Sequence, residues 1–217
     1  MQLPLNIRLR DDATLATYVG NAARRLLDTK GMVFVWGAPG TGRSHLLQAA
    51  CHDARDAGES PIYLTGLAQH AAGVLDGLEQ LPLVCIDDIH EILPSEAWET
   101  ALFHLVNAVR DRGGRLIVSA NCAPARLDVG LADLRSRLLG AASIETDNLD
   151  DSQKLAVLKQ KAAVQGFDLG DEVGRFIMSR ADRDVRTLMD LFAKLEIETL
   201  RRQKKVTIPF VKEVLGL

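Results

Sequence analysis

The stretch MVFVWGAPGTGRSH, residues 32–45, decides how the rest of this chain is interpreted. It opens with a short apolar run rich in β-formers, typical of a buried strand, and ends where helical spacing begins. The segment between them is rich in glycine. Small residues between a strand and a helix let backbone N–H groups surround a phosphate, and the positive end of the helix dipole adds to the attraction. The stretch therefore predicts a phosphate-binding loop.

We expect this loop to hold a nucleotide, ADP or ATP, together with Mg²⁺, for which Ser44 offers its hydroxyl. Loops of this kind carry a lysine at the position of Arg43. Lysine is a compact charge that can follow a γ-phosphate, whereas arginine favours planar, bidentate contacts. Arg43 still neutralises a diphosphate, so we predict nucleotide binding with little or no turnover; a glycine-rich turn without ligand is the alternative. The expected nucleotide contacts of the loop are Gly37, Pro39, Gly40, Thr41, Gly42, Arg43, Ser44 and His45.

A pair of aspartates closes another apolar run, LPLVCIDD, residues 81–88. A carboxylate at the tip of a buried strand is costly unless it faces a metal or a partner. Asp87 is therefore the candidate ligand of Mg²⁺, directly or through water. Asp88 is the candidate for polarising an attacking water or for a structural hydrogen bond. A turn cap without chemistry is the alternative for this pair.

Strands alternate with helices over the first two thirds of the chain. Strands are predicted over 32–36, 61–65, 81–88, 115–121 and 142–146, and helices over about 43–57, near 66–78 and over 98–112, after helical pieces interrupted at 19–21. Nearly continuous apolar strands indicate a parallel five-stranded sheet with helices on both faces. We predict a flexible segment 1–10, an α/β nucleotide-binding domain 11–148 and a small all-helical domain 149–217.

Composition excludes several classes of protein. The chain is 47% apolar and 25% charged, which is ordinary for a globular protein, and its net charge of −3 predicts no strong hold on nucleic acid. No apolar run approaches the roughly 20 residues that span a bilayer, and the start lacks a secretion signal. The three dispersed cysteines indicate buried thiols in a reducing compartment. We expect a cytoplasmic protein without a membrane partner.

Three further polar residues are candidates for chemistry. Asn121 ends the fourth predicted strand, where its amide could reach a γ-phosphate or attacking water, although an asparagine that starts a loop is the commoner case. Arg137, in LADLRSRLLG, could point into a neighbouring molecule's site or be a solvated surface group. Arg186, in DRDVRTL, could fold over bound phosphates or pair with Asp182 or Asp190.

Taken together, these motifs resemble an AAA+ nucleotide-binding domain, and more narrowly the bacterial DnaA family. LVCIDDIH resembles the Walker B motif of the initiator, and LRSRL resembles its arginine-finger box. Within that group the chain is most similar to the Hda family of DnaA-related regulators. The features that carry this match are the QLPLNI start, the GRSHLLQAAC helix, the DRDVRTL motif and the ending VTIPFVKEVLGL. The resemblance covers essentially all 217 residues.

The resemblance implies a negative regulator of replication initiation. Such a protein binds ADP, docks on the sliding clamp of the DNA polymerase and presents an arginine finger, here Arg137, to ATP held by DnaA. Arg186 would then be the sensor-2 arginine and Asn121 the sensor-1 residue. Val19 and Asn21 lie where the family packs the adenine base.

The N-terminal stretch fits a clamp-binding peptide under this resemblance. Such peptides are short extended segments with a glutamine anchor and aliphatic side chains, and they suit a free terminus. Pro4 and Asn6 depart from the usual pattern, and a frayed leader is the alternative. The expected clamp-binding residues are Gln2, Leu3, Leu5 and Ile7.

Two other functions stay open. An autonomous AAA+ ATPase, similar to a helicase loader, would show its own turnover, lost on changing Asp87 or Asp88. An initiator-like DNA binder is disfavoured by the negative net charge, and we expect neither a helix-turn-helix domain after the helical segment nor strong direct DNA binding. Head-to-tail association of two copies is left open, as AAA+ domains often assemble in this way.

Overall fold

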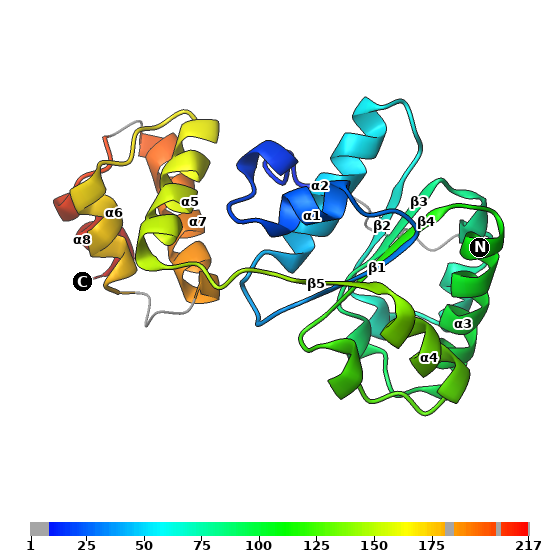
Figure 1. Cartoon of the computed structure of the whole chain (residues 1–217). Helices are drawn as coiled ribbons and strands as arrows, with labels where there is room; N and C mark the ends of the chain where they lie inside the picture. Colours follow the sequence, from blue (N-terminus) through cyan, green and yellow to red (C-terminus); the bar gives the residue numbers. More distant parts are fainter. Residues whose placement is uncertain (1–8, 181–184, 203–204, 217) are drawn as a thin grey trace. The chain divides into compact units, whose positions relative to one another are not determined.

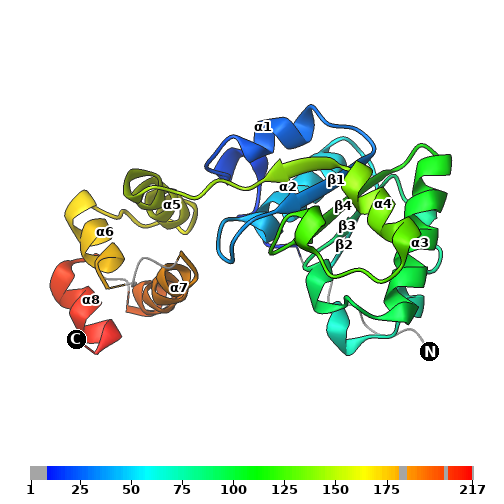
Figure 2. The same cartoon turned by 60° about the horizontal axis from the view of Figure 1, so that its bottom comes forward.

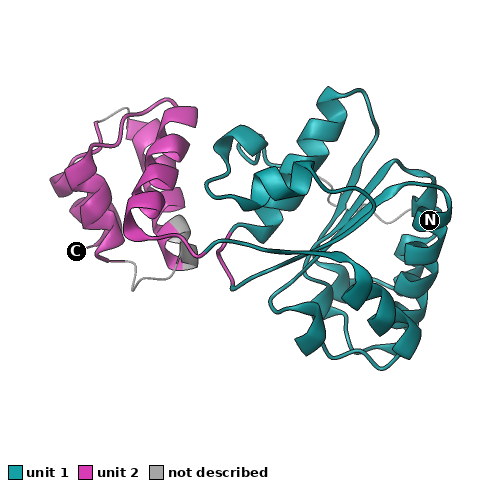
Figure 3. Cartoon of the chain, in the orientation of Figure 1, with its two compact units in different colours: residues 1–38, 42–147 teal, residues 39–41, 148–217 magenta. Residues whose placement is uncertain are grey.

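A computed structural model of the chain describes residues 9–180, 185–202 and 205–216 (Figure 1 and Figure 2). The chain forms two compact units (Figure 3). Unit 1 comprises residues 1–38 and 42–147, and unit 2 comprises residues 39–41 and 148–217. Each unit has its own apolar core. Among the described residues, no helix combines the length and apolarity that crossing a membrane requires.

Unit 1 is built on a five-stranded, all-parallel sheet, which confirms the predicted fold class. The strand order is β2-β3-β4-β1-β5, with β1 between β4 and β5. In a parallel sheet all carboxyl ends meet at one edge, and ligands bind there at the point where the strand order reverses. The strands are β1 Met32–Trp36, β2 Ile62–Leu64, β3 Leu83–Ile86, β4 Arg115–Ala120 and β5 Ala142–Glu145.

Helices cover both faces of this sheet, as the apolar strands require. Helices α1 Ala22–Leu27 and α2 Arg43–Asp56 lie on one face, and α3 Glu96–Asp111 and α4 Ala132–Gly140 lie on the other (Figure 1 and Figure 2). Successive residues of β1 belong to different cores, because the side chains of a strand point alternately to the two faces of the sheet. Val33 and Val35 belong to the core under α1 and α2, and Phe34 belongs to the core under α3 and α4.

The helical segment expected near residues 66–78 is not one continuous helix. Three short 3-10 turns occupy this region: η2 Leu67–Gln69, η3 Ala72–Leu75 and η4 Leu78–Gln80. Gly66 and Gly77 precede two of them with φ angles of 66° and 81°. The turns are separated at His70, Ala71 and Asp76, whose backbones are extended, so no continuous helix forms. Elsewhere in unit 1 the short turns are η1 Leu15–Thr17, η5 Ile89–Glu91 and η6 Pro124–Arg126.

Unit 2 is helical, as its sequence periodicity predicts. Its helices are α5 Asp151–Val164, α6 Asp171–Met178, α7 Val185–Arg202 and α8 Ile208–Leu215. Asp150 begins α5 with a capping box, in which its carboxylate accepts the N–H of Gln153. Leu158, Ile177 and Phe192 are fully buried in the small core between the helices, so unit 2 has an interior of its own.

A buried glutamate fixes the start of α4. Glu99 of α3 is almost fully buried, and its two carboxylate oxygens accept the N–H groups of Gly130 and Leu131 at 2.8 and 2.6 Å. Leu131 is the residue before the first turn of α4. Hydrogen bonds to an ionised acceptor are roughly twice as strong as neutral ones. One side chain of α3 therefore positions the helix that carries Arg137.

We predict that Glu99→Gln lowers the free energy of unfolding by about 1–3 kcal/mol, because an amide accepts only one of the two N–H groups and turns an NH₂ toward the other. Urea denaturation measures the change. Glu96→Gln is the matched control, since Glu96 is exposed in the first turn of the same helix. Equal losses in the two variants would contradict the bridging role of Glu99.

Candidate nucleotide-binding site

The predicted phosphate loop joins β1 to α2 with a backbone that only glycine accepts without strain. Gly40 and Gly42 have φ angles of 82° and 92°. A Cβ on Gly42 would also lie 3.1 Å from Cε2 of Tyr18. The first N–H groups of a helix have no acceptor within that helix, and they carry the positive end of its dipole. Because α2 begins at Arg43, directly after the loop, the backbone here is suited to an anion.

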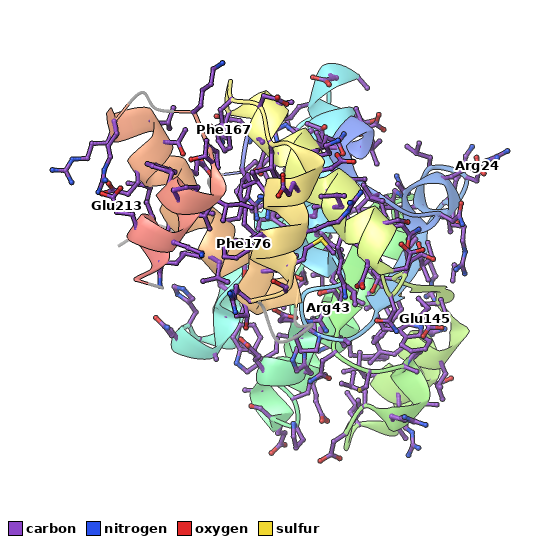
Figure 4. The ribbon with its side chains drawn as sticks, turned by 90° about the vertical axis from the view of Figure 1, so that its left-hand side faces the viewer. Arg24, Arg43, Glu145, Phe167, Phe176 and Glu213 are labelled. Atoms are coloured by element: carbon purple, nitrogen blue, oxygen red, sulfur yellow. The ribbon has the colours of Figure 1, made fainter. Side chains whose placement is uncertain are left out.

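Arg43 ties the loop to the end of β3. Arg43, labelled in Figure 4, is 8% exposed. Its Nη1 donates to the carbonyl of Gly37 at 2.9 Å, and Nη2 lies 2.9 Å from Oδ1 of Asp88. The sequence predicts Arg43 as a phosphate ligand and gives no sign of its contact with Asp88. The positive charge that a phosphate would meet is therefore already partly neutralised by a carboxylate of the same site.

Asp87 lies at the centre of a buried network at the carboxyl end of β3. The hydroxyl of Tyr63 donates to its Oδ2 at 2.7 Å, the hydroxyl of Ser119 donates to its Oδ1, and Ser119 in turn accepts the N–H of Asp88 at 2.9 Å. Burial and the neighbouring Asp87 carboxylate raise the pKa of Tyr63, so its hydroxyl stays protonated and remains a donor. The network joins β2, β3 and β4 through one carboxylate.

The residues present fit Mg²⁺ only as part of a nucleotide complex. No three histidine, cysteine, aspartate or glutamate side chains gather as a metal site in the described part of the chain. Mg²⁺ in nucleotide sites is held by one or two protein groups, with phosphates and waters completing the shell. Asp87 is 2% exposed and both its oxygens accept hydroxyls, so only its remaining lone pairs are open to a metal-bound water. Ser44 is half-buried at the start of α2.

Asp88 is held in an unusual state. It is the one described residue other than glycine with a positive φ, 53°, and it precedes η5. Burial and the charge of Asp87 raise the pKa of its carboxyl above the ordinary value of 3.8, although Arg43 and His90 act in the opposite direction. The attraction of Arg43 is thus smaller than the combined penalty of burial and carboxylate repulsion.

A second group of residues lines the other side of the loop. Gly20 has a φ of 127°, and a Cβ there would lie 2.5 Å from Oδ2 of Asp147. The same oxygen accepts the N–H of Asn21 at 2.8 Å, so the turn at Gly20 is fixed by the end of β5. Val19 is half-buried in this turn. The segment proposed to contact the adenine base is therefore attached to the residues that follow β5.

Tyr18 is a residue of this region that sequence reasoning missed. Its ring meets the ring of His45 edge-on with centroids 5.6 Å apart, and it touches the Gly42 position. Its hydroxyl is buried and has no hydrogen-bond partner within the part of the chain that the structure describes. Burial, reinforced by Asp147, raises the pKa of this hydroxyl, so it is a neutral donor beside the loop. Tyr63 and Ser119 were missed as well, because nothing local marks them.

The other predicted residues lie in several places. Asn121 directly follows β4 and is exposed, at the same edge of the sheet as Asp88. Arg137 is exposed on α4 and borders a cavity that Lys30, Gly31 and Met32 also line, so it lies near the beginning of β1 and away from the loop at its end. Arg186 is in the first turn of α7, and its side chain lies outside the described atoms. Gln2, Leu3, Leu5 and Ile7 lie outside the described residues.

The sheet order, the loop after β1 and the carboxylates after β3 define the AAA+ class of nucleotide-binding fold. The comparisons with known proteins agree. Residues 13–145 match the family described as the bacterial DnaA ATPase domain, and residues 151–215 match the Hda lid domain. Since the first match covers more than half of the 217 residues, the chain belongs to the bacterial DnaA ATPase domain family.

Solved structures show the same fold. Domain III of the Thermotoga maritima replication initiation protein DnaA superposes with a TM-score of 0.81 at 20% identity, covering 96% of this chain and 98% of that one. AMPPCP-bound DnaA from Aquifex aeolicus gives 0.70 at 23% identity, covering 90% and 70%. The Thermotoga maritima RuvB Holliday junction branch migration motor gives 0.63 at 18% identity, covering 93% and 66%.

We predict that Asp88→Asn raises the free energy of unfolding at pH 7 and leaves it unchanged near pH 3. A carboxyl whose pKa is raised on folding favours the folded state while protonated. That contribution is lost as the pH rises from 3.8 through the raised value, and asparagine does not carry the resulting penalty. Urea denaturation across this pH range measures it, with the exposed Asp53→Asn as control. A lower stability at pH 7 would mean that the pair with Arg43 is net stabilising.

Proposed function

We propose that this DnaA-related AAA+ protein is a negative regulator of replication initiation, which binds ADP and promotes hydrolysis of ATP held by DnaA. The observation that carries the proposal is the contrast between two arginines. Arg43, at the chain's own loop, is buried against Gly37 and Asp88. Arg137 is exposed on α4, and no hydrogen bond or ion pair holds it within the described part of the chain.

The protein's own site is proposed to hold nucleotide with little turnover. The left-handed glycines and the start of α2 suit a diphosphate, and the AMPPCP-bound DnaA structures support a nucleotide ligand here. Bound Mg²⁺ would neutralise phosphate charge, with Ser44 and Asp87 as its protein partners. Arg43 lacks the free, compact charge that follows a γ-phosphate, because its guanidinium is already shared with Asp88. Binding without efficient hydrolysis is the expected result.

Arg137 is proposed to act in trans on ATP bound to DnaA. Leu134 and Leu138 of the same helix are buried, and Glu99 holds the residues before the helix, so Arg137 stands on a rigid support. A guanidinium supplied to phosphoryl transfer stabilises the charge of the transition state and accelerates hydrolysis by about 10³–10⁵. That corresponds to roughly 4–7 kcal/mol of barrier. Rigid placement matters because the charge must be in position before the reaction.

Docking on the sliding clamp is proposed for the N-terminal segment that contains Gln2, Leu3, Leu5 and Ile7. Leu9 is buried in the core under α1 and α2, and the N–H of Arg10 donates to Gln48 at 2.9 Å. These contacts anchor the chain to unit 1 from Leu9 onward. Holding the protein on a clamp would raise its effective concentration near a DnaA molecule on the same DNA.

An autonomous AAA+ ATPase is the second candidate, because Asp87 and Asp88 end a strand beside the loop as an ATPase requires. It predicts turnover of free ATP by the protein alone, abolished by Asp87→Asn. The regulator predicts that free ATP turns over slowly whether or not Asp87 is changed. Measuring phosphate release without DnaA distinguishes the two.

We predict that Arg137→Ala abolishes stimulation of hydrolysis, a loss of at least about 10²-fold, while fold and nucleotide affinity stay unchanged. The assay is single-turnover hydrolysis of labelled ATP bound to DnaA, with DNA-loaded sliding clamp and with or without this protein. Arg135→Ala is the matched control, being exposed on the same helix two residues away. Full stimulation by Arg137→Ala would rule out the finger.

We predict that removing residues 1–8 abolishes binding to the sliding clamp without unfolding unit 1, because the deletion stops before the buried Leu9. Clamp affinity is measured by surface plasmon resonance, and folding by thermal denaturation. Gln2→Ala in the full chain is the milder variant. Unchanged clamp affinity after truncation would leave the N-terminal segment without this role.

A further inference from the structure

A cavity of about 540 Å³ lies between α3, α4 and the beginning of β1 in unit 1, where α3 and α4 run side by side (Figure 1 and Figure 2). We call it the α3–α4 cavity. Its floor is apolar and is formed by Met32, Val106, Val109 and Leu116. This cavity belongs to neither the phosphate loop nor the aspartate pair, which are built at the other edge of the sheet. Its volume and apolar residues leave room for an apolar side chain.

All the charged side chains that line this cavity are positive. Its lining includes Lys30, Arg110 and Arg137 and contains no carboxylate. Arg110 contacts the adjacent Asp111 at 3.0 Å, but both side chains are exposed and the pair is therefore weak. Lys30 and Arg137 have no ion pair within the described residues. The cavity thus has an apolar floor and a positive rim.

A neighbouring cavity shows that this charge is specific to the site. It measures about 670 Å³ and shares Lys30 and the glycines of the α3–β4 turn with the α3–α4 cavity. Its further lining adds two arginines, Arg112 and Arg115, and three carboxylates. Those carboxylates belong to Asp53, Glu59 and Glu79. Here the charges of the lining cancel, whereas the charged side chains that line the α3–α4 cavity are all positive.

The position of Arg137 links this cavity to the proposed function, on which the inference rests. A partner that brings its ATP to Arg137 must also cover the rim of the α3–α4 cavity. Leu139, two residues further along α4, is 50% exposed and adds apolar surface to the same helix. Complementary charge across an interface steers association and selects the partner.

We propose that the α3–α4 cavity is the docking site for an acidic segment of the ATP-bound DnaA partner. This segment places an aliphatic or aromatic side chain over the apolar floor and a carboxylate beside Lys30 and Arg110. The cavity then supplies affinity and orientation, whereas Arg137 supplies charge to the reaction. These two contributions are separable. The cavity sets the concentration of this protein needed for half-maximal stimulation, and Arg137 sets the rate at which the bound complex hydrolyses ATP.

The test is the single-turnover assay with ATP-loaded DnaA and clamp, with this protein varied in concentration. Arg110→Glu is expected to raise the half-saturating concentration about tenfold while the maximal rate stays unchanged. Arg112→Glu is the matched control, because Arg112 is exposed two residues away at the same helix end but lines the neighbouring cavity. Both substitutions remove the same favourable interaction of a positive side chain with the negative end of the dipole of α3. Equal effects of the two would overturn the proposal.

A second variant fills the cavity without touching the buried floor. Ser136→Trp introduces a large ring from an exposed position on its lining and is expected to raise the half-saturating concentration as well. An unchanged concentration in both Ser136→Trp and Arg110→Glu would overturn the proposal. So would sedimentation showing that they disrupt only self-association, because the occupant would then be a second copy of this chain.

Failure of this inference and failure of the proposed function give different results. If Arg137→Ala abolishes the maximal rate while Arg110→Glu leaves half-saturation unchanged, the finger stands and the docking site is overturned. If Arg110→Glu shifts half-saturation while Arg137→Ala reacts at the full rate, the docking site stands and the finger is overturned.

Discussion

The buried carboxylate of Asp87 is the constraint on which the rest of the site depends. A charge taken out of water is costly unless hydrogen bonds replace its hydration, and here the hydroxyls of Tyr63 and Ser119 do so. Because these hydroxyls come from β2 and β4, the network holds three neighbouring strand ends in register. It also brings the next residue, Asp88, to a fixed position beside the loop. The position of Arg43 follows from that, since its guanidinium meets Asp88.

The parallel sheet separates the two proposed activities of unit 1. Strand carboxyl ends gather the phosphate loop, Asp87, Asp88 and Asn121 at one edge. Arg137 and the α3–α4 cavity lie near the beginning of β1. One edge would therefore hold the protein's own nucleotide and the other would meet a partner. Glu99 of α3 fixes the residues that begin α4, and so positions the helix that carries Arg137.

Short-range patterns in the sequence predict strands and helices, and they give no sign of contacts between residues far apart in the chain. The five strands and the helical C-terminal region follow from apolar periodicity, and the structure confirms them. The turn between β1 and α2 has glycines with positive φ, as the sequence predicts, and its binding of phosphate stays a prediction. The helical segment expected near residues 66–78 is divided into three short turns, because the backbone is extended at His70, Ala71 and Asp76. Tyr63 and Ser119 could not be identified from local pattern, since they lie 24 and 32 residues from Asp87 in the chain. Only the pairing of β2, β3 and β4 brings them together.

By itself, the sequence determined the class of fold, the position of the phosphate loop and the presence of an arginine in place of its lysine, because strand and helix periods and glycine turns act over a few residues. Only the tertiary structure decided what that arginine does. The partners of Arg43 are a carbonyl six residues away and a carboxylate on a different strand. The balance between burial, the charge of Asp87 and the attraction of Arg43 is set by distances in three dimensions. Those distances exist only once the strands have paired.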